Sequence, residues 1–208
     1  MTMQTSCSQQ PKIIGESPLE LENFDFNLNI KTFIPEKYYS QESQLIVIPV
    51  NGGTVAIKRD TIYRDSIHFH TPNEFSIQKI PEWILYKERF NSSHDLYVKF
   101  GEFQFRNIGF AVSLDNKIMA VGVQTPYGFN KEMNDNFVRL LTNKYGDYSA
   151  DEGEGVFSIY TKYSWELNDR IIHYWSYRNE EKTNYAGEFY IYKKEYADKI
   201  METFKYRF

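Results

Sequence analysis

Hydrophobic and polar residues alternate along much of this chain, which is the pattern typical of β-strands that bury one face. Residues 24–30 show the alternation without a break. Every second side chain of a strand lies on the same face. The predicted buried face of this segment consists of Phe24, Phe26, Leu28 and Ile30. Pro35 then bounds the strand, because proline has no N–H to donate to a β-ladder.

Two apolar runs around an Asn-Gly-Gly sequence predict a β-hairpin. Its arms are residues 45–50 and 54–58, and Asn51-Gly52 suits the positive φ angles of a tight turn. Pro49 favours a position at the edge of a sheet for the first arm. We expect a further strand over residues 61–69.

Residues 71–95 allow two interpretations. Pro81 suits the first turn of a short helix that carries Trp83, Ile84 and Phe90. An irregular excursion fits the same stretch, since no period runs through it.

The pattern becomes clearer after residue 103. Residues 103–112 predict a long strand. Its apolar residues change from odd to even positions near Asn107, which indicates a bulge or bend there. A turn at Asp115-Asn116 leads into a strand over 118–123. The next apolar positions follow helical spacing, with Asn130 as N-cap and Gly146 as the stop. They are Met133, Phe137, Leu140, Leu141 and Tyr145.

Three strands and a helix complete the chain. We expect the strands over residues 156–165, 170–177 and 185–192, and the helix over 194–204. Short turns join antiparallel strands, and no strand–helix–strand alternation suggests a parallel sheet. The predicted fold is therefore α+β: a mainly antiparallel, aromatic-rich sheet with a few helices packed on one face.

The domain organisation follows from the same pattern. Residues 1–20 are rich in Ser, Gln, Pro and Gly and predict a flexible tether, and residues 21–208 form the globular part. The globular part is either one continuous domain or two subdomains, 21–95 and 96–208.

Composition narrows the function classes. Aromatic residues make up 17% of the chain, which favours strands. A net charge of −4 argues against a nucleic-acid partner. One cysteine leaves no internal disulfide and no cysteine-based zinc site. We find no nucleophile elbow, phosphate loop or dinucleotide fingerprint, so we expect no catalytic residues and no cofactor.

Aromatic residues crowd the three C-terminal strands. Tyr and Trp are favoured at binding interfaces, so a sheet face that presents them could bind a protein or a glycan. The candidate ligand-binding residues are Tyr163, Trp165, Trp175 and Tyr177. The alternative is that these side chains pack under helices and against neighbouring strands.

Two segments carry residues of the kinds that bind metals. His68 and His70 would share one face of a strand, with Glu74 and His94 as further candidate ligands. The acidic glycine segment 151–155 offers carboxylates for Ca²⁺. Two histidines do not complete a site and the acidic segment lacks EF-hand spacing, so we predict no metal.

The N-terminus contains the short sequence Thr5-Ser6-Cys7, followed by a polar run. Two small residues before a cysteine resemble the cleavage box of bacterial lipoproteins, which implies lipidation of Cys7 and a membrane tether. Gln4 departs from that pattern, and no charged and apolar signal regions precede Cys7. Either a signal peptide begins upstream of Met1, or Cys7 is an ordinary thiol in a polar N-terminus.

Three function hypotheses remain. The first is a binding module tethered to the cell envelope that recognises a protein or glycan through aromatic side chains. The second is a cytoplasmic, toxin-neutralising protein, similar in size and acidity to small immunity proteins. The third is a metal-assisted hydrolase centred on His68 and His70.

Overall fold

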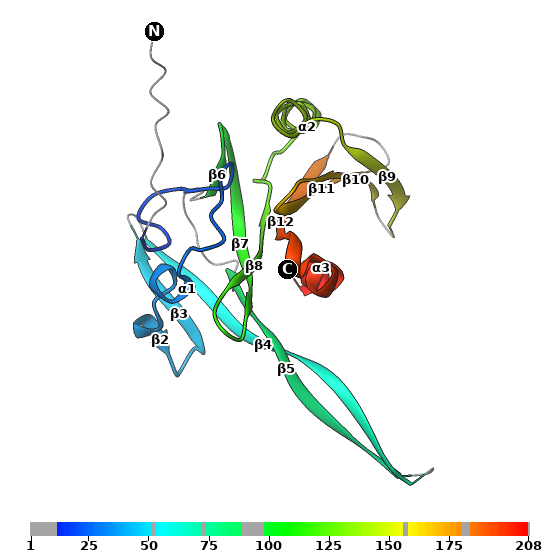
Figure 1. Ribbon diagram of the computed structural model, residues 1–208. Coiled ribbons are helices and arrows are strands. Elements are labelled where there is room, and N and C mark those ends of the chain that lie inside the picture. The colour runs from blue at the N-terminus through cyan, green and yellow to red at the C-terminus, as the bar shows by residue number, and fades with distance from the viewer. Residues whose placement is uncertain are drawn as a thin grey trace.

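The computed structural model describes residues 12–50, 53–71, 74–88, 98–155, 158–179 and 184–207, with the side chains of 68–71, 74, 75, 206 and 207 left out. Within these ranges the chain forms an α+β fold dominated by antiparallel strands, as the sequence predicts (Figure 1). No helix of this part is long and apolar enough to cross a membrane.

The N-terminal half contains short elements followed by two long strands. The elements are β1 (Leu19–Glu20), α1 (Ile30–Phe33), the 3-10 helix η1 (Glu36–Tyr38), β2 (Tyr39–Ser40), β3 (Leu45–Val50), β4 (Gly53–Thr71) and β5 (Glu74–Glu88).

The C-terminal half follows the predicted order with two additional strands, β6 and β9. Its elements are β6 (Val98–Phe100), β7 (Phe103–Ser113), β8 (Ile118–Gln124), α2 (Lys131–Tyr145), β9 (Ser149–Glu154), β10 (Ile159–Glu166), β11 (Arg170–Arg178), β12 (Tyr185–Lys193) and α3 (Lys194–Arg207).

One continuous sheet joins the two halves. Its strand order is β2-β3-β4-β5-β7-β8-β12-β11-β10-β9, and β6 pairs with β7 beside this path. Most described pairs are antiparallel, and β1 runs parallel to β6. The main junction between the halves is the pairing of β5 with β7.

The helices divide between the two faces of the sheet rather than gathering on one. Phe137 and Leu141 of α2 lie in a large core cluster together with α1 and the N-terminal segment. Ile200 and Phe204 of α3 lie in a second cluster on the opposite face, which includes Trp83. Alternate residues of β12 enter the two clusters, so this strand is buried on both sides.

The predicted strand over residues 24–30 is wrong. The Phe24 N–H donates to the Leu21 carbonyl at 3.3 Å and the Leu28 N–H to the Asp25 carbonyl at 3.1 Å, so the segment consists of successive turns. Phe24, Phe26 and Ile30 are nevertheless buried. Successive turns can therefore bury alternate apolar residues as a strand does.

The interpretations of residues 71–95 as a helix or an irregular excursion are also wrong for the described part. Residues 74–88 form β5, which pairs with β4 along its length. The register shifts between Ile62 and Tyr63, whose partners are Trp83 and Pro81. Glu82 is therefore the extra residue of a β-bulge, a position that tolerates the missing N–H of Pro81.

Several local predictions are confirmed. Asn107 has a φ of 51° at a register shift in β7, and Asn116 has a φ of 66° in the following turn. The Asn130 side chain accepts the Met133 N–H at the start of α2, and Gly146 ends that helix with a φ of 84°. β3 and β4 pair as the predicted hairpin, whose Asn51-Gly52 turn lies outside the described residues.

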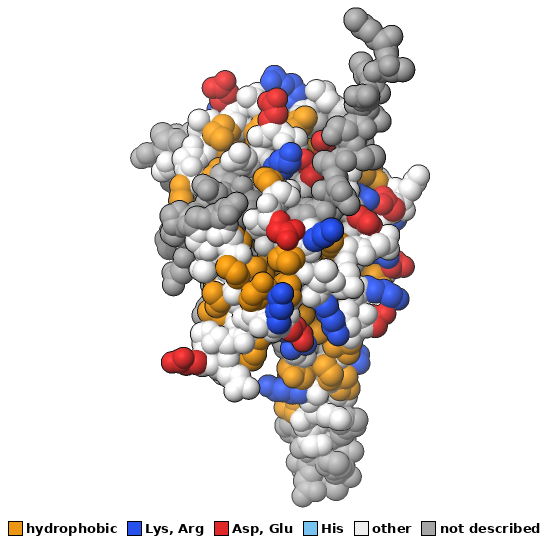
Figure 2. All heavy atoms as spheres, turned by 90° about the vertical axis from the view of Figure 1, so that its left-hand side faces the viewer, with side chains coloured by type: hydrophobic (Ala, Val, Ile, Leu, Met, Phe, Trp, Pro, Cys, Tyr) orange, Lys and Arg blue, Asp and Glu red, His pale blue; other side chains and the backbone are white. Residues whose placement is uncertain are grey.

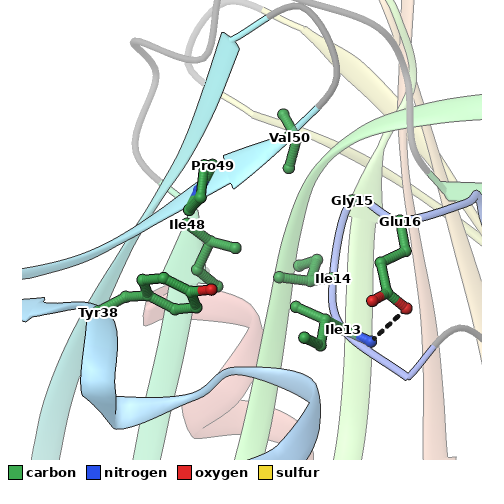
Figure 3. A pocket seen from close by; sticks show the side chains of 8 residues that line it. All are labelled: Ile13, Ile14, Gly15, Glu16, Tyr38, Ile48, Pro49 and Val50. Atoms are coloured by element: carbon green, nitrogen blue, oxygen red, sulfur yellow. Dashed lines mark hydrogen bonds between the residues drawn. The ribbon is translucent and has the colours of Figure 1, made fainter.

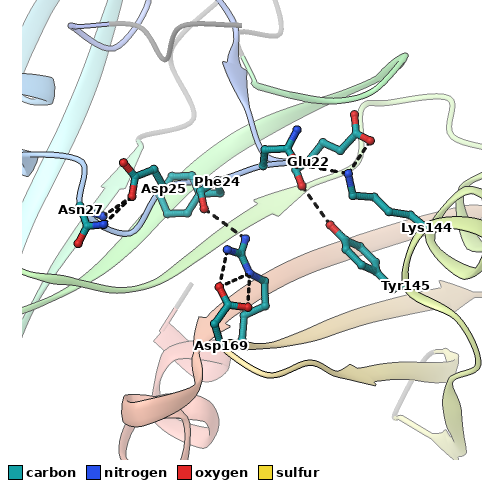
Figure 4. Close-up of polar contacts among 9 residues, drawn as sticks. Glu22, Phe24, Asp25, Asn27, Lys144, Tyr145 and Asp169 are labelled. Carbon is teal, nitrogen blue, oxygen red and sulfur yellow. Dashed lines mark hydrogen bonds and ion pairs between the residues drawn. The ribbon is translucent and has the colours of Figure 1, made fainter. Parts of the chain in front are cut away.

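A polar clamp fastens the N-terminal segment to the C-terminal half (Figure 4). Lys144 Nζ lies 2.6 Å from Glu22 Oε1, and the Tyr145 hydroxyl donates to the Glu22 carbonyl at 3.2 Å. Arg170, paired with Asp169, donates to the Phe24 carbonyl at 3.2 Å. Burial raises the pKa of Tyr145, so its hydroxyl stays a donor at any physiological pH.

Candidate binding surfaces

The four predicted ligand-binding aromatics lie on opposite faces of the sheet. Tyr163 pairs with Tyr174 and Trp165 with Ile172, whose side chains belong to the cluster under α2. Trp175 packs at the margin of the other cluster, beneath α3. Tyr177 is two residues further along β11 and therefore lies on the same face of the sheet. The structure therefore brings these residues together in two pairs and not in one site.

Trp165 is part of the core. Its side chain is 1% exposed, and Nε1 donates to the Gly146 carbonyl at 3.0 Å, where α2 ends. The half-buried Tyr163 stacks beside it with a centroid distance of 6.4 Å. Burial raises the pKa of Tyr163. This pair fixes the end of α2 on the sheet.

Trp175 lies in a half-buried group on the opposite face. Its ring lies 5.1 Å from that of Tyr160 and 6.5 Å from that of Tyr177, centroid to centroid. Lys205 Nζ of α3 lies 3.1 Å from the Trp175 ring centroid, and Lys162 Nζ lies at 5.7 Å. We call Tyr160, Lys162, Trp175, Tyr177 and Lys205 the Trp175 cluster. The prediction that aromatic side chains bind a ligand remains a prediction, and it now applies to this cluster.

Two ionisable groups lie close to the Trp175 cluster. Glu188 accepts hydrogen bonds from the hydroxyls of Tyr177 at 3.0 Å and Tyr190 at 2.9 Å. His173 is 6% exposed, and its burial, aided by Lys162 and Lys205, lowers its pKa to about 3. His173 is therefore neutral at physiological pH and poorly suited to proton transfer there.

The histidine candidates cannot be assembled into a site here. His68 and His70 lie in the outer part of β4, where His68 pairs with Ser76, but their side chains and His94 lie outside the described residues. Cys7 also lies outside them. Among the described side chains, no group of three or more His, Cys, Asp or Glu residues could hold a metal ion.

The acidic glycine segment is largely an edge strand. Residues 149–154 form β9, which pairs with β10 along one side. Asp151 and Glu152 are neighbours in a strand, so their side chains leave opposite faces. Charged residues along an exposed edge hinder pairing with other chains. The carboxylates of β9 are therefore suited to protecting this edge.

Tyr127 is an exposed aromatic residue that sequence reasoning missed. It is 84% exposed in the loop between β8 and α2, and the Arg106 guanidinium lies 3.7 Å from its ring centroid. Arg106 Nε also donates to the Thr125 carbonyl at 2.8 Å, which holds the cation in place. A depression of about 360 Å³ nearby is lined by Glu102, Phe103, Gln104, Pro126 and Met133. The sequence signal was Pro126 and Gly128, which present the intervening residue on a loop.

A second depression lies where the N-terminal segment meets the end of β3 (Figure 3). Its volume is about 460 Å³, and its lining includes Ile13, Tyr38, Ile48 and Val50. Glu16 lies at the margin, where its carboxylate accepts the Ile13 N–H at 3.2 Å. Gly15 has a φ of 87°, and a Cβ there would lie 2.1 Å from Val50 Cγ1. The close approach of Gly15 to β3 therefore shapes this pocket.

Three of the exposed large hydrophobic side chains lie in the outer part of the β4–β5 hairpin. β3 pairs with β4 up to Lys58 and β7 pairs with β5 from Trp83, so beyond these positions the hairpin projects as a two-stranded ribbon (Figure 1). Tyr63 is 49% exposed, and Ile67 and Ile77 are each 55% exposed. Figure 2 shows hydrophobic side chains exposed along the described part of the ribbon.

The two faces of this ribbon differ in chemistry. Cross-strand pairing places three pairs on one face, which we call the ribbon face: Tyr63 with Pro81, Asp65 with Lys79, and Ile67 with Ile77. The opposite face carries Ser66 beside Gln78 and Arg64 beside the half-buried Ile80, and Arg64 Nε lies 3.5 Å from Glu82 Oε1. A solvated ribbon needs no apolar side, so the exposed apolar side chains of the ribbon face make it a candidate binding surface.

Comparison of the chain with models of protein families, with curated proteins and with solved structures gave no match.

Proposed function

We propose that this protein is a protein-binding module whose recognition element is the ribbon face of β4 and β5. The observation that carries the proposal is the cross-strand pair of Ile67 and Ile77, each 55% exposed on a ribbon that extends beyond the sheet. Isolated exposed apolar residues are ordinary, but paired ones on a projecting element are typical of interaction sites.

The energetics support this assignment. Covering an aliphatic side chain of this size removes it from water and contributes about 1.5–3 kcal/mol. A two-stranded ribbon is also marginally stable in water without further packing. A partner on the ribbon face would therefore gain binding energy and stabilise the ribbon together.

The test is affinity capture from an extract of the producing organism, with matched serine variants. Ile67→Ser and Ile77→Ser remove apolar surface from the ribbon face. Leu114→Ser is the control, because Leu114 is 51% exposed in the turn between β7 and β8, away from the ribbon. We expect wild type and the control to retain the same protein, and the ribbon variants to lose it.

A retained protein whose binding is unaffected by both ribbon variants would refute the proposal. A glycan ligand would instead depend on the Trp175 cluster, so binding to a glycan array that Trp175→Ala abolishes and Ile67→Ser leaves intact would move recognition to α3.

The proposal includes tethering at the cell envelope through Cys7. It is supported by the small residues Thr5 and Ser6 before the cysteine and by the polar run after it. Mass spectrometry of protein from its native cells should find a diacylglyceryl group on Cys7. An unmodified N-terminus at Met1 would contradict the tether and leave the ribbon proposal standing.

A further inference from the structure

We propose that the partner of the ribbon face is the ribbon face of a second copy of this chain. This inference rests on the proposed function, because it names the protein that the ribbon binds. It is carried by the order of side chains along the face, in which one charged pair lies between two apolar pairs.

The charged pair is available for contacts between copies. Asp65 and Lys79 are both exposed and are cross-strand neighbours. Neither forms an ion pair with any residue that the structure describes. On the other face, by contrast, Arg64 is already paired with Glu82. Opposite charges that form no ion pair among the described residues, framed by apolar side chains, suit a surface that is complementary to itself.

The charges also select the symmetry. Two copies that pack face to face are related by a two-fold axis lying in the interface. If the axis runs across the strands at the level of the charged pair, β4 packs on β4 and Asp65 faces Asp65. If it runs along the strands, β4 packs on β5 of the second copy, and each Asp65 faces a Lys79. The second arrangement also places Ile67 on Ile77 and Tyr63 on Pro81, so every contact is complementary.

The size of the face sets the expected strength. Stable protein interfaces bury about 1,200–2,000 Å² in total, which is more than three residue pairs on each side supply. We therefore expect a reversible dimer with a dissociation constant in the micromolar to millimolar range, about 10⁻⁶–10⁻³ M.

The experiment is sedimentation velocity over a concentration series, with charge-reversed variants of the full chain. Asp65→Lys gives a ribbon face with two lysines, and Lys79→Asp gives one with two aspartates. We expect each variant alone to self-associate at least about tenfold more weakly than wild type, because like charges then meet across the interface. An equimolar mixture of the two variants should recover dimers, since lysines of one copy then face aspartates of the other.

Recovery in the mixture separates contact between copies from a folding defect within one copy, because mixing cannot repair a misfolded ribbon. Circular dichroism of each variant provides the control for folding. Wild-type protein that stays fully monomeric up to about 1 mM, the weakest dissociation constant of the expected range, would overturn the inference. So would dimers that the single reversals leave unchanged. A monomer that still captures a different protein through Ile67 would overturn the self-association while the proposed function stands.

Discussion

The aromatic core beneath α2 makes a quantitative prediction for Phe137. This side chain is completely buried and packs against five other rings at centroid distances of 5.0–5.8 Å. The rings belong to Phe100, Phe103, Phe105, Tyr174 and Phe189, so Phe137 joins α2 to four strands. Phe137→Ala removes these contacts at once.

The expected loss lies at the upper end of the range for such substitutions. Phe→Ala in a core costs about 3–5 kcal/mol, and aromatic pairs add about 0.5–1.5 kcal/mol each beyond their buried area. Neighbouring rings cannot all move to fill the cavity, because they are fixed on paired strands. We therefore expect a loss of about 4–5 kcal/mol, a large part of the ~5–15 kcal/mol stability of an ordinary domain.

Urea unfolding followed by circular dichroism measures this loss. With an m-value of about 2 kcal/mol/M, the midpoint should fall by roughly 2 M without a change in slope. Asn143→Ala, at an exposed position of the same helix, is the control and should change stability by less than about 0.5 kcal/mol. A loss below about 1 kcal/mol for Phe137→Ala would refute the argument that α2 is held by this contact.

Three further predictions address other parts of the fold. Iodide should quench the fluorescence of Trp175 and leave Trp83 and Trp165 unaffected, since the latter two are at most 1% exposed; single Trp→Phe variants assign the signal, and quenching of Trp165 would contradict its place in the core. Gly122→Ala should destabilise the protein by about 1–3 kcal/mol, because the new Cβ would lie 2.8 Å from the ring of the fully buried Tyr190; a neutral effect in thermal unfolding would show that this ring moves freely. The pKa of His173 is about 3 in the folded protein and about 6.5 in the unfolded chain. The contribution of this lowered pKa to the free energy of unfolding is therefore complete above pH 6.5 and is lost as the pH falls toward 3. Between pH 7 and 5 this loss amounts to about 2 kcal/mol, and a His173→Phe variant should not show it in urea titrations at the two pH values.

Elements that depend on local signals could be predicted from the sequence. The boundaries of α2 follow from a cap at Asn130 and a stop at Gly146, which act within a few residues. The register shift at Asn107 and the strands that follow it could be predicted from the alternation of apolar and polar residues alone. In these segments the burial pattern and the local backbone preference agree.

Elements that depend on distant partners could not be predicted. The burial of Phe24 and Phe26 was correct, but turns rather than a strand produce it, and hydrophobic alternation cannot distinguish the two. β5 escaped prediction because its outer half is solvated on a ribbon and has no buried face to give it a period. Pro81 added to the error, since only the register with β4 reveals the bulge beside it.

The candidate surfaces show the same division. Composition indicated that aromatic residues of β10 and β11 were worth attention, but not which of them a helix covers. The contact of Lys205 with Trp175 depends on where α3 crosses the sheet. The exposure of Ile67 and Ile77 depends on how far the neighbouring strands β3 and β7 extend along the hairpin. The sequence around the two isoleucines does not predict this.

The polar clamp of Figure 4 has a consequence for synthesis of the chain on the ribosome. Phe24 and Arg170 are separated by 146 residues, and Glu22 must also await Lys144 and Tyr145. At about 5–20 residues per second, the N-terminal segment leaves the ribosome roughly 7–30 s before its last partner is made. The clamp cannot close during that interval, and the Arg170 guanidinium, which lies 5.5 Å from the Phe26 ring centroid in the finished protein, is still missing. The N-terminal segment of a nascent chain is therefore less firmly held and more open to chaperones and to aggregation. Slowing translation downstream of the segment would lengthen this exposure, whereas the finished protein would be unchanged.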